Sequence, residues 1–328
     1  MKEIVHLLLE NGSLNGKQAK EVLLGITSNK YNASEIAAFM SVYLMRPITV
    51  EELSGFREAM MQQCEKIDLG KNTIDIVGTG GDGKNTFNIS TLSCFVTAAA
   101  GYKVAKHGNY GVSSVSGSSN LLEAVGYKFT NDASVLSDQL ETAGLCFLHA
   151  PLFHPSMKNV AASRKELGVR TFFNMLGPIV NPSSPEFQLL GVYNLETARL
   201  YNYLLQETGT RYVIVHSVDG YDEISLTSDF KMITRSSERL IEPASLGFEK
   251  LKQIDLSGGA SLQKAVEIFM AVLEGNATKA QSDAVCINAA VAISCVSPEK
   301  RIEDCIAEAR EALESKKALK IFKQLTKN

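Results

Sequence analysis

The stretch TIDIVGTGGDGKNTFNIST, residues 73–91, indicates the kind of sheet around which this chain folds. The apolar run 74–77 is followed at once by the glycine-rich segment 78–83, and a helical pattern then extends over 89–100. This order predicts a strand, a turn and a helix. Strands that alternate with helices in this way form mainly parallel sheets with helices on their faces.

The same alternation continues toward the C-terminus. We expect further strands at 103–105, 146–149, 188–193 and 212–216, with helical segments such as 135–142 and 155–167 between them. Between 223 and 243 the alternation breaks into short β-like pieces, which suggests a hairpin or an antiparallel edge. Helical patterns dominate again from 261 to the end.

Residues 1 to about 67 contain helical patterns only, and four helices fit. Asn32 precedes Glu35 by three residues, and Thr49 precedes Glu52 by three, which is the spacing of a capping box. The pattern changes near 68–72, where we expect a domain border. A length of 328 residues also exceeds the usual span of a single core.

The composition is that of an ordinary globular protein, with 45% hydrophobic residues, 21% charged residues and a formal net charge of -3. The charge balance gives no reason to expect nucleic-acid binding. The six cysteines are scattered without a C-x-x-C pair, so we expect reduced packing residues. No apolar stretch of about 18 residues occurs, and the N-terminus lacks a signal-peptide pattern. We therefore expect a cytoplasmic protein that does not enter a membrane.

The segment 78–83 is the strongest candidate for a binding site, because four of its six residues are glycine. Glycine lets backbone N–H groups approach an anion closely. Asn88, Ser90 and Thr91 follow at the expected helix start, where free N–H groups favour phosphate. Together they suggest a pyrophosphate cradle. The alternative is a turn with a helix cap, and the segment has neither the Rossmann nor the Walker spacing.

A second polar segment, 106–120, follows the next expected strand. Ligands of parallel sheets bind at the carboxyl ends of strands, where both segments would lie. Lys106 offers a charge to a phosphate, and Ser113, Ser114 and Ser118 offer hydroxyl donors. A serine-rich surface linker is the alternative. His107 could be a general base, but positioning of backbone or substrate is an equally good interpretation.

Asp222 and Glu223 form a carboxylate pair of the kind that holds magnesium directly or through water. Acidic pairs are also common in loops without a metal. Arg164 and Arg170 lie on and after the expected helix 155–167, where a solvated helix face is the alternative to a binding role.

These segments are similar to the anthranilate phosphoribosyltransferase family, and the resemblance covers essentially the whole chain. Six motifs occur in the family's order, and they are GTGGD at 78–82, NIST at 88–91, KHGN at 106–109, the serines and glycine of 113–118, the arginine segment 164–171 and NMLGPIVNP at 174–182. The later segments 220–223 and 286–290 also fit.

The resemblance implies a nucleoside phosphorylase/phosphoribosyltransferase-like α/β fold in two domains. A small all-helical domain, 1–68 with roughly 170–207, would form the dimer contact. A larger α/β domain, 72–169 and 208–328, would bind phosphoribosyl pyrophosphate on a mainly parallel sheet flanked by helices. The active site would lie in the hinge between them.

The resemblance also implies roles for individual residues. Magnesium, with two ions per subunit, would be bound by Ser90, Asp222 and Glu223. Anthranilate would contact Gly78, Asn109 and Arg164, and Lys106 and Arg164 would be catalytic. The full set of substrate-binding residues would be Gly78, Gly81, Asp82, Thr86, Asn88, Ile89, Ser90, Thr91, Lys106, His107, Gly108, Asn109, Ser113, Ser114, Ser118 and Arg164.

The activity implied is transfer of the phosphoribosyl group to the amine of anthranilate in L-tryptophan biosynthesis, by a homodimer. Two alternatives remain open, a pyrimidine nucleoside phosphorylase-like enzyme and a non-catalytic nucleic-acid-binding relative. The chain departs from the family at two positions, with Tyr110 in place of the usual Arg and Asn120 in place of the usual Asp. If those two side chains pair in relatives, the two lost charges would offset each other.

Overall fold

The computed structural model describes residues 1–111 and 116–327, and these form two compact units. The first unit comprises Met1–Ile67 and Ala150–Pro182, and the second comprises Asp68–His149 and Ser183–Asn328. No helix of the described residues is long and apolar enough to cross a membrane.

The first unit is entirely helical among its described elements, which are α1 (Lys2–Leu9), α2 (Gly16–Thr27), α3 (Ala33–Met45), α4 (Val50–Gln63), α8 (Ala150–Phe153), η1 (Pro155–Met157), α9 (Lys158–Leu167), α10 (Phe173–Leu176) and η2 (Gly177–Ile179). The four helices predicted before residue 67 are confirmed. Both predicted capping boxes form as well: Glu35 N donates to Asn32 Oδ1 at 3.0 Å, and Glu52 N donates to Thr49 Oγ1 at 3.1 Å.

The second piece of the helical unit is 150–182, whereas the resemblance implied roughly 170–207. Helix α9 explains the difference, because it packs against α2 and α3, and Asn159 Nδ2 on it donates to the Thr27 carbonyl oxygen at 2.6 Å. Residues 183–207 belong to the α/β unit instead, since they contain a central strand of its sheet.

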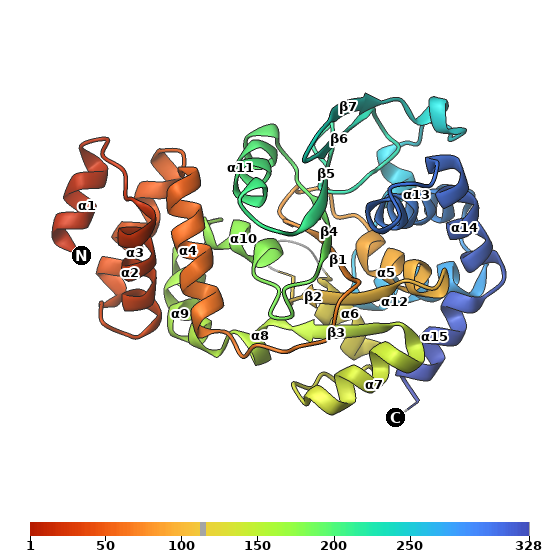
Figure 1. Cartoon of the computed structure of the whole chain (residues 1–328), viewed down its shortest axis with the longest axis horizontal. Helices are drawn as coiled ribbons and strands as arrows, with labels where there is room; N and C mark the ends of the chain where they lie inside the picture. The colour runs from red at the N-terminus through yellow and green to blue at the C-terminus, as the bar shows by residue number, and fades with distance from the viewer. Residues whose placement is uncertain (112–115, 328) are drawn as a thin grey trace. The chain divides into compact units, whose positions relative to one another are not determined.

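The second unit is built on a seven-stranded sheet with the order β3-β2-β1-β4-β5-β6-β7 (Figure 1). Its strands are β1 (Thr73–Gly78), β2 (Lys103–Gly108), β3 (Leu145–His149), β4 (Phe187–Gly191), β5 (Arg211–Ser217), β6 (Phe230–Thr234) and β7 (Glu238–Ile241). The first five strands pair in parallel, and the last two pair antiparallel. The prediction of a mainly parallel sheet with an antiparallel edge is confirmed.

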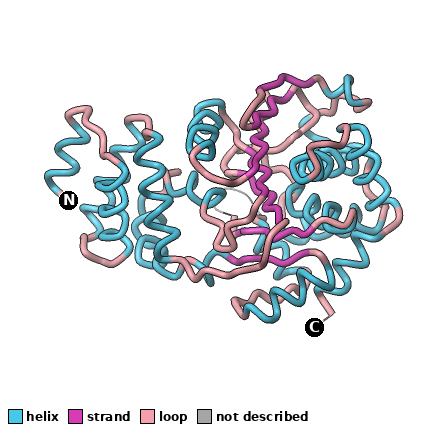
Figure 2. Tube along the Cα trace, in the orientation of Figure 1, coloured by secondary structure: helices cyan, strands magenta, loops and turns pink. Residues whose placement is uncertain are grey.

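Helices cover both faces of this sheet, as the cyan segments around the magenta strands show in Figure 2. The helical elements of the unit are α5 (Ile89–Ala99), α6 (Ser118–Ala124), α7 (Ala133–Ala143), α11 (Leu195–Gln206), η3 (Pro243–Leu246), η4 (Gln253–Leu256), α12 (Leu262–Glu274), α13 (Lys279–Val296), α14 (Ile302–Glu314) and α15 (Lys317–Leu325). Helix α13 packs against α5, α14 and the strands β4 and β5, so most of its residues are buried. Its near-continuous apolar sequence follows from this burial on several sides.

Candidate active site

Three parallel strands of the second unit end in glycine at the same edge of the sheet. Gly78 of β1 is paired with Gly191 of β4, and Gly108 of β2 is paired with His149 of β3. Because parallel strands share a carboxyl edge, the segments that follow β1 and β2 come together there. Asn88 Nδ2, at the start of α5, donates to the Ser116 carbonyl oxygen at 3.1 Å and links the two.

Glycine is required at Gly78 and Gly191 because Asp222 lies directly against both. A Cβ at Gly191 would lie 1.7 Å from the Asp222 carbonyl oxygen, and a Cβ at Gly78 would lie 2.3 Å from Asp222 Oδ2. Gly80, at φ +65°, donates its N–H to Asp222 Oδ2 at 2.6 Å. The pair Asp222 and Glu223 thus lies against the ends of β1 and β4, beside the glycine-rich segment 78–83.

Glu223 reaches the start of α5. Its Oε1 accepts the Ser90 N–H at 2.9 Å, and its Oε2 accepts the Thr86 hydroxyl at 3.4 Å. The structure therefore brings together Ser90, Asp222 and Glu223, the three residues expected to hold magnesium.

The carboxylates at this edge repel one another. Burial and the charge of Asp82 raise the pKa of Asp222, and burial and the charge of Asp222 raise the pKa of Glu223. A cation would relieve this repulsion, and carboxylate oxygens are the ligands that Mg²⁺ prefers. The donor set therefore fits magnesium, although no group of three or more His, Cys, Asp or Glu side chains in the described part of the chain is arranged to hold an ion by itself.

Lys106 and His107 lie in the interior of β2, where both side chains are buried. Lys106 Nζ donates to the backbone carbonyl of Ile76 on β1. The His107 backbone N–H donates to Asp75 Oδ1 at 3.1 Å, so Asp75 links the middle of β1 to β2. Sequence reasoning missed Asp75, because a single carboxylate within an apolar strand gives no indication of its partner.

The remaining residues of the first segment differ in what they can offer a ligand. Asp82 Oδ1 accepts the Lys84 N–H at 3.0 Å and shapes the turn. The Ile89 side chain is fully buried in the core, and its N–H donates to the Phe87 carbonyl oxygen at 2.6 Å. The Thr91 side chain is also buried. Both residues belong to the expected substrate-binding set, and with their side chains buried, their backbone groups are what they can offer a ligand.

In the second segment, Ser118 Oγ donates to the Asn109 carbonyl oxygen at 3.3 Å and lies close to Gly108, where a Cβ would approach it to 2.5 Å. Ser113 and Ser114, expected to bind substrate, lie outside the described residues.

Arg164 lies on α9 of the first unit. Its guanidinium sits 5.1 Å from the centre of the Phe173 ring, and burial lowers its pKa. This environment argues against the solvated helix face considered for it. Arg170 follows the end of that helix and is exposed.

Comparison with known proteins places the chain in a family. It matches the model described as "Glycosyl transferase family, helical bundle domain" over residues 2–64 and the one described as "Glycosyl transferase family, a/b domain" over 70–319. An anthranilate phosphoribosyltransferase of Cytophaga hutchinsonii is 54% identical over 328 residues, covering 100% of both chains. The chain belongs to the anthranilate phosphoribosyltransferase family. A Flavobacterium psychrophilum relative of the same name is 54% identical and covers 99% of this chain and 98% of its own.

Solved structures of the family agree in fold. The enzyme of Thermus thermophilus superposes with a TM-score of 0.91 at 30% identity, covering 98% of each chain. The enzyme of Saccharomyces cerevisiae, in complex with PRPP and Mg, gives a TM-score of 0.91 at 27% identity and covers 98% of this chain and 96% of its own.

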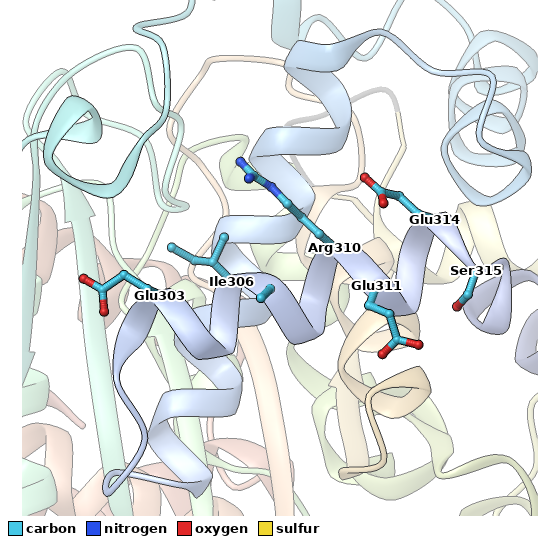
Figure 3. A pocket seen from close by; sticks show the side chains of 7 residues that line it. Glu303, Ile306, Arg310, Glu311, Glu314 and Ser315 are labelled. Atoms are coloured by element: carbon cyan, nitrogen blue, oxygen red, sulfur yellow. The ribbon is translucent and has the colours of Figure 1, made fainter.

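A separate pocket of about 490 Å³ lies along α14, away from the glycine segments in sequence (Figure 3). It is lined by one arginine, three glutamates and small or apolar side chains, which are Glu303, Ile306, Ala307, Arg310, Glu311, Glu314 and Ser315. The excess of carboxylates disfavours a phosphate-bearing substrate of this family. The sheet edge therefore remains the candidate active site.

Proposed function

We propose that this chain transfers the phosphoribosyl group of phosphoribosyl pyrophosphate to the amine of anthranilate. The products are N-(5-phosphoribosyl)anthranilate and pyrophosphate, in L-tryptophan biosynthesis. The main support is the close contact of Asp222 with Gly78 and Gly191, beside two glycine-containing segments. The chain also has full-length relatives named for this activity.

The acidic pair and the start of α5 would hold magnesium, with two ions per subunit. Asp222 and Glu223 would supply carboxylate oxygens, and Ser90 its hydroxyl. When bound, magnesium neutralises charge on the pyrophosphate. Glu223 is held ready for this by the Ser90 N–H, and Asp222 by the Gly80 N–H.

Stabilisation of the leaving pyrophosphate is the main task of the remaining residues. Negative charge accumulates on it as the bond to the sugar loosens, so preorganised donors aimed at it lower the barrier. Backbone N–H groups of the glycine segment, the side chains of Asn88 and Ser118, and Lys106 are the proposed donors. Lys106 Nζ would exchange the Ile76 carbonyl for a phosphate oxygen.

The amine of anthranilate needs no strong base, because an aromatic amine is already neutral near pH 7. His107 is accordingly proposed to position β2, whose backbone is fixed by Asp75, and not to move a proton.

We expect Arg164→Ala to raise the KM for anthranilate by about tenfold or more, because a guanidinium can pair with the substrate carboxylate through two hydrogen bonds. The KM for phosphoribosyl pyrophosphate should change much less. Steady-state kinetics with each substrate varied in turn would measure both. Lys165→Ala, an exposed cation on the same helix, is the control, and an unchanged anthranilate KM in Arg164→Ala would remove Arg164 from this role.

We also propose that the protein is a cytoplasmic homodimer that associates through its helical unit. Leu9 of α1 and Met45 of α3 are 66% and 87% exposed, and Leu7 and Leu44 beside them are partly exposed. Exposed apolar side chains on neighbouring helices are typical of an association surface. Light scattering should give twice the chain mass for the wild type and a lower mass for Leu9→Lys with Met45→Lys, and a monomeric wild type would contradict the proposal.

Product analysis separates this activity from its rivals. Mass spectrometry should detect phosphoribosylanthranilate and pyrophosphate when both substrates and magnesium are supplied. A pyrimidine nucleoside phosphorylase would instead release free base from nucleoside and phosphate, and a nucleic-acid-binding relative would form neither product.

A further inference from the structure

The side chain of Asn120 connects the two ends of the polar segment after β2, residues 109–111 and 117–119, which together form the base of this segment. This residue is the third of α6, and its Oδ1 accepts the N–H of Gly117 at 3.1 Å, which is an ordinary cap at a helix start. The same oxygen also accepts the N–H of Gly111 at 2.9 Å, nine residues earlier in the chain. One acceptor therefore joins two backbone positions that flank residues 112–116.

The two stretches of chain at this base are in direct contact. A Cβ at Gly117 would lie 2.1 Å from the Gly111 nitrogen, although the φ of Gly117, −78°, is open to any residue. Glycine is needed here for close approach and not for its backbone angle. The Ser119 N–H adds a second connection by donating to the Asn109 carbonyl oxygen at 3.2 Å.

The side chain of Tyr110 makes two further contacts at this base. Its hydroxyl donates to Glu123 Oε1 at 2.8 Å, and its ring meets the His149 ring edge-on with centroids 4.9 Å apart. His149 Nδ1 is in turn hydrogen-bonded to Ser119 Oγ at 2.9 Å. The two departures from the family pattern, Tyr110 and Asn120, thus have separate partners in this chain.

We propose that Asn120 is a positioning residue for phosphoribosyl pyrophosphate. Its amide oxygen holds the two ends of the base together through Gly111 and Gly117. This fixes Asn109 and Ser118, which belong to the proposed binding site. Ser118 is connected to Asn109, and Ser116 is connected to Asn88 of the other segment, so displacement of the base moves ligand contacts on both sides. This inference rests on the proposed function.

The chemistry predicts which substitutions are tolerated. Because both contacts use Oδ1 as an acceptor, a carboxylate can replace the amide and a methyl group cannot. Asn120→Asp should therefore behave like the wild type, whereas Asn120→Ala should lose both hydrogen bonds and leave two backbone N–H groups without their acceptor. Asn276→Ala, at an exposed residue of the same unit, is the matched control.

Two measurements on the full-length protein test the proposal. Hydrogen exchange followed by mass spectrometry should show faster exchange at Gly111 and Gly117 in Asn120→Ala, and wild-type rates in Asn120→Asp and Asn276→Ala. Calorimetric titration with phosphoribosyl pyrophosphate and magnesium should show about tenfold weaker binding in Asn120→Ala, the cost of a misplaced binding group. Binding in Asn120→Asp should stay within about threefold of the wild type, since its acceptor is retained.

Each contrary outcome has a distinct meaning. Unchanged exchange in Asn120→Ala would show that the side chain does not close the base, and faster exchange with unchanged affinity would show that closure does not serve binding. Equal damage from Asp and Ala would overturn the acceptor argument. A wild type that does not bind phosphoribosyl pyrophosphate at all would contradict the proposed function. The exchange experiment would still show whether Asn120 holds the two ends of the base together.

Discussion

The double substitution Asp222→Asn with Glu223→Gln is expected to lower kcat/KM by at least about 10²-fold, the scale on which loss of transition-state electrostatics acts. Both replacements keep the shape of the side chain and remove its charge. Hydrogen bonds from Gly80 and Ser90 can still be accepted by the amide oxygens. Steady-state kinetics at a magnesium concentration that just saturates the wild type would measure the loss, which follows from weaker metal binding and not from a displaced loop.

The same substitutions should make the metal-free protein more stable at alkaline pH. The pKa values of both carboxyl groups are raised in the folded state, by burial and by neighbouring carboxylates. Their contribution to stability is fully present below the ordinary pKa of about 4 and is lost as the pH rises through the raised values. The Tm of the wild type in chelator should therefore fall from about pH 4 to about pH 8, and the Tm of the variant should fall less.

Magnesium reverses this difference. Binding to the deprotonated carboxylates stabilises the folded wild type most where they are ionised, so the Tm gain from magnesium should grow with pH and be small in the variant. Asp304→Asn, which removes an exposed carboxylate of α14, is the control and should match the wild type throughout. Full activity in the double variant, or a magnesium effect on Tm equal to that of the wild type, would remove the pair from metal binding.

Gly191→Ala is expected to destabilise the α/β unit by about 3 kcal/mol or more, the upper range for overpacking. The new Cβ would lie 1.7 Å from the Asp222 carbonyl oxygen, and neither backbone can yield without displacing β4 or the acidic pair. Denaturant unfolding would measure the loss of stability.

Gly209→Ala provides the matched control in the same unit, because a Cβ there would meet no atom within 4 Å. It should be neutral or slightly stabilising, since alanine reduces the freedom of the unfolded chain. If the free energy of unfolding of Gly191→Ala equalled that of the wild type, Asp222 could not lie in close contact with β4.

The helices and strands that could be predicted are those whose limits are determined by residues close together in the sequence. The capping boxes at Asn32 and Thr49 fix two helix starts from three-residue spacings, and the strand, glycine turn and helix of 73–99 follow from one change of pattern. The antiparallel edge was also predicted, because the alternation breaks where β6 and β7 occur.

Features that depend on long-range contacts were not predictable. Residues 150–182 belong to the helical unit because α9 packs against α2 and α3, which lie more than a hundred residues away in sequence. Burial of Ile89 in the core and the connection of Asp75 to β2 likewise depend on which faces the folded chain turns inward. The motif order predicted the loops of the candidate site, but not which of their side chains are buried in the folded chain.

The most direct measurement is the loss of anthranilate fluorescence in a mixture of purified protein, phosphoribosyl pyrophosphate and magnesium, with and without chelator. We expect consumption of anthranilate that requires all three components and stops when the chelator is added. Anthranilate that persists under every condition, with folded protein and intact phosphoribosyl pyrophosphate, would contradict the proposed activity.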